Sequence, residues 1–193
     1  MVDVVYTVGH STRSLDELAS LLSEASVSEV VDVRSVPGSR RNPHLAGRSL
    51  AASLPPRGIS YTHEQRLGGF RRPRPDSPNA GWQQEAFRGY ADHMASGDFR
   101  GGLERLLTIA RARTACVMCA ETQWWRCHRR LIADALLVRG FRVLHLGLGP
   151  SPAEHELTPF AVVGKDFQIT YPPAQGQLEL GAVAGHVSRQ QTG

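Results

Sequence analysis

Lysine is almost absent from the sequence: of the 22 basic residues, only Lys165 is a lysine and the rest are arginines. Cysteine is also scarce, and an odd set of three thiols does not make a disulfide framework. No apolar run approaches the roughly 18 residues of a membrane-spanning helix. The first residues lack the basic stretch and apolar core of a secretory signal. We therefore expect a cytoplasmic protein with reduced thiols and no membrane partner.

The composition is that of an ordinary folded protein. Hydrophobic residues make up 41% of the chain and charged residues 21%, and the length suffices for one domain with its own core. The preference for arginine has two explanations. One is a coding bias of the genome, and the other is a need for guanidinium groups, which bind phosphates and carboxylates through two hydrogen bonds at once.

Alternating strand and helix patterns predict a single α/β domain. Five short runs rich in β-branched or apolar residues are typical of strands: 2–8, 29–33, 59–63, 114–119 and 141–146. Helical spacing of apolar residues predicts five helices: 14–26, 47–54, 82–96, 101–112 and 127–139. Ser14 and Glu17 match a capping box at the start of the first helix. This order predicts a Rossmann-like, mainly parallel sheet with helices on both faces.

The pattern weakens after Gly149. We expect residues 1–149 to form the α/β domain and residues 150–172 to form a C-terminal extension packed on it. Within that extension, 160–171 is the candidate for an added strand or hairpin. Residues 173–193 are rich in glycine, glutamine and alanine and are expected to form a flexible tail.

Reactive side chains follow the predicted strands. His10 lies just beyond the first strand, Arg34 follows the second, and His63 and Cys119 end two others. In an open parallel sheet, ligands bind beyond the carboxyl ends of the strands. We therefore expect these side chains to lie close together at one edge of the sheet.

Positive charge is concentrated in the loops that should overhang this edge. The span 34–74 contains nine arginines and a single acid, Glu64, for a net charge of +8, while the whole chain carries +4. A cleft of that sign attracts anionic ligands. We assign substrate or phosphate binding to four residues of this span: Arg34, Arg40, Arg41 and His44. The alternative is a solvated basic face.

The segment 119–130 holds a second group of candidates. Cys119 ends a strand shortly before a helix, and the positive end of a helix, together with Arg126 and His128, would lower the pKa of its thiol. We name Cys119, Glu121, His128 and His10 as candidate catalytic residues, and add Arg126 and Arg129 to the phosphate-binding set. The alternative is that Cys119 and Cys127 are buried structural residues, as we expect for Cys116.

The spacing of residues in 119–130 can be compared with that of two other kinds of site. A tyrosine-phosphatase loop is disfavoured, because Arg126 lies one position too far from Cys119 and two tryptophans replace the usual glycines. A zinc site through Cys119, Cys127 and His128, with His10 or His44 as fourth ligand, does not have a usual spacing. We expect no cofactor and keep zinc as the alternative. Trp124 and Trp125 are candidates both for the core and for stacking on bases.

Several separated motifs resemble a known family. They are Val8-Gly9-His10-Ser11, Asp32-Val33-Arg34-Ser35-Val36-Pro37, Arg40-Arg41-Asn42-Pro43-His44, Leu67-Gly68-Gly69, Cys119-Ala120-Glu121 and Cys127-His128-Arg129. In this order, over residues 4–147, they are similar to the bacterial and archaeal domain-of-unknown-function family 488. The resemblance implies a single cytoplasmic α/β domain and places these histidine, arginine, cysteine and glutamate residues in the family's pattern, but it implies no reaction.

These observations favour a protein that binds, and as an enzyme processes, a nucleotide or nucleic acid in a cleft of arginine, histidine and cysteine. N-glycosidic cleavage, phosphoryl transfer and thiol chemistry all stay open. The alternative is a non-catalytic nucleic-acid-binding module, in which arginines contact phosphates and aromatic rings stack on bases. A cysteine-based redox or metal sensor is a third possibility.

Overall fold

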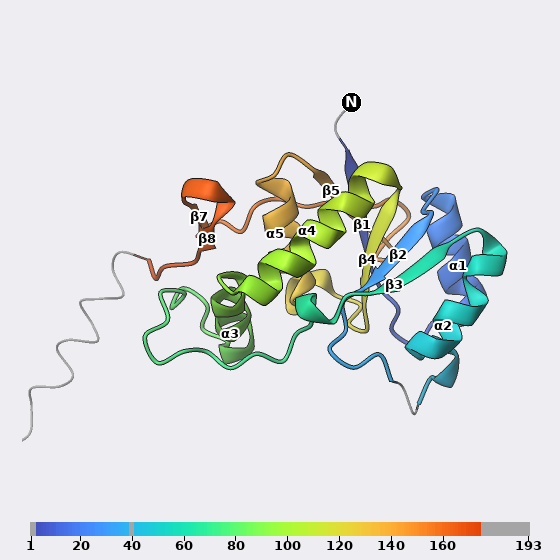
Figure 1. Cartoon of the computed structure of the whole chain (residues 1–193), viewed down its shortest axis with the longest axis horizontal. Helices are drawn as coiled ribbons and strands as arrows, with labels where there is room; N and C mark the ends of the chain where they lie inside the picture. The colour runs from blue at the N-terminus through green and yellow to red at the C-terminus, as the bar shows by residue number, and fades with distance from the viewer. Residues whose placement is uncertain (1–2, 39–40, 175–193) are drawn as a thin grey trace, which may run out of the picture.

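The computed structural model describes residues 3–38 and 41–174. The chain folds as one mixed α/β domain around a six-stranded sheet of order β3-β2-β4-β1-β5-β6 (Figure 1). The strands are β1 (Val4–Gly9), β2 (Glu29–Asp32), β3 (Ser60–His63), β4 (Ala115–Cys119), β5 (Arg142–His145) and β6 (Ala153–Glu154). All neighbours pair in parallel except β5 and β6. The predicted fold class is confirmed.

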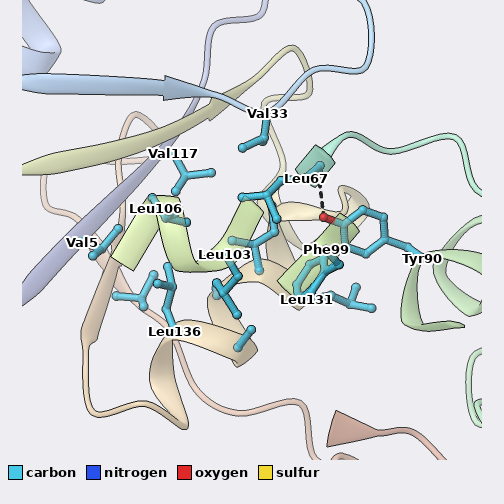
Figure 2. Close-up of a cluster of buried hydrophobic side chains, with 14 of the residues drawn as sticks. Val5, Val33, Leu67, Tyr90, Phe99, Leu103, Leu106, Val117, Leu131 and Leu136 are labelled. Atoms are coloured by element: carbon cyan, nitrogen blue, oxygen red, sulfur yellow. Dashed lines mark hydrogen bonds between the residues drawn. The ribbon is translucent and has the colours of Figure 1, made fainter. Parts of the chain in front are cut away.

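Helices cover both faces of the sheet, and each face has its own core (Figure 1). One layer consists of α1 (Leu15–Glu24) and α2 (Gly47–Ser53), and the other of α3 (Glu85–Met94), α4 (Gly97–Ala112) and α5 (Arg129–Leu137). Because side chains alternate along a strand, Met118 of β4 packs with the first layer and Val117 with the second. Figure 2 shows the second core, which contains Val117 of β4 together with Leu103 and Leu106 of α4.

Helix ends differ from the sequence expectations where local hydrogen bonds compete. The capping box at Ser14 is present as predicted. Helix α4 begins at Gly97 rather than 101, because the Ser96 side chain caps it by accepting the Phe99 N–H. Helix α5 begins at Arg129 rather than 127, because residues Trp124–Arg126 form a 3-10 turn that leaves the next residue extended.

The C-terminal extension is attached to the domain by pairing and by burial. Strand β6 extends the sheet, and β7 (Val162–Val163) pairs with β8 (Ile169–Thr170) as the expected hairpin. Tyr171 is fully buried, and its hydroxyl donates to the Asp134 carboxylate of α5 over 2.8 Å. Most of the tail expected at 173–193 lies outside the described residues. Within the described ranges, no helix is both long and apolar enough to cross a membrane.

The Tyr171–Asp134 contact predicts a stability change. Tyr171→Phe removes the donor and leaves a buried carboxylate oxygen without it, so the free energy of unfolding should fall by about 1.5–3 kcal/mol. Tyr6→Phe is the matched control, because the Tyr6 hydroxyl makes no hydrogen bond within the described part of the chain. Urea denaturation measures both variants. An equal loss of unfolding free energy in Tyr171→Phe and Tyr6→Phe would show that the Tyr171–Asp134 hydrogen bond does not stabilise the fold.

Candidate active site

A pocket of about 640 Å³ opens at the carboxyl edge of the sheet. Its walls include His10 after β1, Arg34 after β2 and Cys119 at the end of β4. The strand order brings these three residues together from distant parts of the sequence, because β2, β4 and β1 are neighbours. The arginine-rich segment after β2 contributes to the same pocket.

Two cysteines and a histidine are in direct contact on the pocket wall. The Sγ atoms of Cys119 and Cys127 are 2.9 Å apart, and Cys127 Sγ lies 3.5 Å from Nδ1 of His128. Both cysteine residues are nearly buried, at 2% and 6% exposure. The 3-10 turn before α5 is the element that returns Cys127 to the end of β4. The three groups therefore share one proton-transfer network.

Cys127 is the acidic thiol of the pair. Its pKa lies well below the usual range, first because the Cys119 thiol donates a hydrogen bond to it, and further because His128 and Arg129 are nearby. Burial, and the neighbouring Cys127, raise the pKa of Cys119 well above its usual range. The sequence instead predicts the lowered pKa for Cys119. Cys116 faces the other helix layer, and burial raises its pKa as well.

His128 is oriented by the backbone. Its Nε2 lies 3.1 Å from the carbonyl oxygen of Val33, and since a carbonyl only accepts, Nε2 carries a hydrogen. Nδ1 is therefore directed to the Cys127 sulfur. Gly69 packs on the ring so closely that a Cβ there would lie 2.9 Å from Nδ1. A thiol, an imidazole and an orienting group at these distances form the arrangement typical of an activated cysteine nucleophile.

His10 has both ring nitrogens engaged. Nε2 lies 2.9 Å from Nη1 of Arg34, which can only donate, so Nε2 accepts. Nδ1 then carries the hydrogen and donates to the Ser11 carbonyl over 2.9 Å. Burial lowers the pKa of His10, and the Arg34 charge adds to this effect. In this tautomer His10 positions Arg34, which also binds the Asp32 carboxylate, and has no nitrogen left for the acid/base role expected from the sequence.

Arg129 lies behind the pocket wall and does not line it. It is 1% exposed and donates to the main-chain carbonyls of Glu121 and Thr122 and to the Thr7 hydroxyl. Among the residues described, it forms no ion pair with a carboxylate. Its guanidinium therefore holds the loop after β4 instead of binding the substrate phosphate that we expected.

Two arginines are available at the pocket. Arg41 and Arg126 line it, have exposed side chains, and form no ion pair within the described ranges. Glu121 also lines the pocket and is exposed, with its carboxylate accepting the Gln123 N–H over 3.0 Å. These three residues place two positive charges and one negative charge on the pocket lining.

Other predicted residues lie elsewhere. His44 is exposed, with Nε2 3.0 Å from the Arg13 carbonyl, and is not part of the pocket lining. Arg40 lies outside the described residues. Trp124 stacks on His145 with ring centroids 4.1 Å apart, which is a packing role. No group of three or more histidine, cysteine, aspartate or glutamate side chains is arranged to hold a metal in the described part of the chain.

The +8 charge of the span 34–74 is partly neutralised by carboxylates outside that span. Four of the eight arginines of the span that the structure describes form ion pairs, three of them with acids that precede or follow the span: Arg34–Asp32, Arg57–Asp16, Arg66–Glu64 and Arg74–Asp76. The count along the sequence therefore overstates the positive charge available to a ligand.

Sequence reasoning missed Asp32 and Phe70. The Asp-x-Arg spacing was a usable signal for Asp32, because it places a carboxylate within reach of the Arg34 guanidinium, which binds it. Phe70 follows the Gly68-Gly69 pair and lines the pocket. No pattern in the sequence marks its exposure.

A family model described as "Domain of unknown function DUF488" matches residues 14–136, more than half of the chain. The chain belongs to the DUF488 family. Comparison with curated proteins and with solved structures found no match. In this DUF488 chain the matched range contains Arg34, Cys119, Cys127 and His128, and begins after His10. The family description names no reaction, so the chemistry has to be argued from the geometry.

The 2.9 Å contact predicts that Cys119 and Cys127 join on oxidation. Diamide should remove one hydrogen from each thiol and form a disulfide, which needs the sulfurs to approach to about 2.05 Å. Mass spectrometry of unreduced peptides identifies the bond. Cys116→Ala is the control and should not change the result, because Cys116 packs in the other core. Thiols that stay free in excess diamide would contradict the geometry.

Proposed function

We propose that this DUF488 protein is a thiol-dependent enzyme that acts on a nucleotide or on nucleic acid, with Cys127 as the nucleophile. The observation that carries the proposal is the position of Cys127 Sγ, 2.9 Å from the Cys119 thiol and 3.5 Å from His128 Nδ1, on the wall of a pocket that also contains exposed arginines. A nucleophile of this kind needs reduced thiols, which supports the cytoplasm as its compartment.

The reaction proceeds in two steps. Nδ1 of His128 first takes the Cys127 proton. The resulting thiolate attacks an electrophilic carbon or phosphorus atom of the substrate, and the leaving group departs with the bonding electrons and takes that proton from Nδ1. Water then attacks the covalent intermediate, giving its proton back to His128, and the thiolate is restored. The net change is addition of water across the broken bond. Glu121, exposed on the pocket lining, is suited to orient the water.

The pocket arginines bind the substrate's anionic group. Arg41 and Arg126 have exposed guanidinium groups without carboxylate partners in the part of the chain described, so they are available to a phosphate. Arg34 lines the same pocket, but Asp32 already binds its guanidinium. The sequence-based assignment of phosphate binding therefore rests on Arg41 and Arg126.

A redox sensor is the second candidate, and the contact between the two sulfur atoms favours it. It would use the same cysteines without turnover. A non-catalytic nucleic-acid-binding module would use the arginines alone and would not depend on either thiol. Turnover and its dependence on Cys127 separate the three functions.

The test is turnover on a panel of nucleotides and oligonucleotides, with products separated by chromatography. Cys127→Ser should abolish turnover. His128→Gln should lower it by roughly 10²- to 10⁴-fold, the usual loss when a general acid/base is removed. Cys116→Ala, which changes a thiol of the opposite core, should retain it. Turnover that survives Cys127→Ser would overturn the nucleophile assignment, and binding without turnover would favour the module.

A further inference from the structure

Phe70 is the most exposed large apolar residue in the described ranges, and it lines the active-site pocket. Its exposed fraction is 96%. Its φ is +60°, in the left-handed region that a bulky side chain rarely adopts. Strained residues of this kind persist where the surrounding structure imposes them, and they cluster at functional sites.

The backbone on both sides of Phe70 is held in place. The Ser35 hydroxyl donates to the Gly69 carbonyl over 2.8 Å, and Nε of Arg71 donates to the Gly68 carbonyl over 3.2 Å. Gly69 itself is packed against His128. The position of Phe70 is therefore fixed relative to Cys127 and His128, although its ring is open to solvent.

The pocket combines aromatic and cationic residues. Phe87 and Tyr90 of α3 line it together with Phe70. The Tyr90 hydroxyl is occupied by the Leu67 carbonyl, to which it donates over 2.7 Å (Figure 2), so Tyr90 contributes its ring. Arg41 and Arg126 supply the positive charge. A ligand that complements both features carries a planar ring and an anionic group.

We propose that Phe70 is a specificity-determining residue that stacks on the base of a single nucleotide. This inference rests on the proposed function and names its substrate class. Cys127 is only 6% exposed and lines a pocket of about 640 Å³, a volume suited to a small ligand such as a single nucleotide. Stacking on an aromatic ring accepts any base, because every base has a π-face.

Calorimetric titration of the intact chain tests this inference. The probes are AMP, GMP, CMP and UMP, with ribose 5-phosphate as the ligand that has the phosphate but no ring. At least one nucleotide should bind about tenfold more tightly than ribose 5-phosphate. Phe70→Ala and Phe70→Leu should both remove that difference and leave ribose 5-phosphate binding unchanged. Phe167→Ala is the matched control and should leave the ring preference unchanged, because Phe167 is also an exposed phenylalanine with a positive φ, +59°, but does not line this pocket.

The inference and the proposed function fail in different ways. Four results would each overturn the role of Phe70. They are equal affinity for ribose 5-phosphate and the nucleotides, no nucleotide binding at all, a ring preference retained in Phe70→Ala, and tighter binding of a duplex oligonucleotide. Turnover that depends on Cys127 would still stand. Conversely, a ring preference that is lost in Phe70→Ala but accompanied by turnover in Cys127→Ser would preserve the stacking role and refute the nucleophile.

Discussion

The hydrogen bonds donated by the buried guanidinium of Arg129 hold the pocket wall in place. The guanidinium binds the carbonyls of Glu121 and Thr122, and so fixes the loop that follows Cys119 at the end of β4. Gly9 permits the close approach of this loop to β1, since a Cβ at that position would lie 1.9 Å from the Glu121 carbonyl oxygen. The charge of Arg129 also lowers the pKa of Cys127. One cation therefore shapes the loop and favours a thiolate beside it.

A directional chain of hydrogen bonds joins this cation to a buried carboxylate. Arg129 donates to Thr7, the Thr7 hydroxyl donates to Nδ1 of His145 over 2.7 Å, and His145 Nε2 donates to Nδ1 of His155 over 3.1 Å. His155 Nε2 donates to Asp134 over 2.9 Å. Burial lowers the pKa of His145 to about 3, which keeps it neutral. Because His155 belongs to the C-terminal extension, this extension helps to hold the loop after β4.

The strands and the residues that follow each of them were predictable, because the alternation of strands and helices is visible in the sequence and parallel strands end at one edge of a sheet. That was enough to bring His10, Arg34 and Cys119 together. The roles within the site were not predictable. Nothing in the spacing shows that a 3-10 turn returns Cys127 to Cys119, or that Arg129 points into the interior. The net charge of residues 34–74 likewise does not show which of their arginines pair with acids outside that range.

The proposed chemistry requires that Cys127 is a thiolate stabilised by the Cys119 thiol. Ultraviolet absorbance of the thiolate, titrated with pH in the native chain and in Cys119→Ala and Cys127→Ala, measures this directly. We expect a titration well below the free-thiol value of about 8.5, absent in Cys127→Ala and shifted upward in Cys119→Ala. Because folding lowers this pKa, the associated stability is lost as pH falls through it. A native titration at or above about 8.5, or a low one that survives in Cys127→Ala, would show that Cys127 is not the acidified thiol.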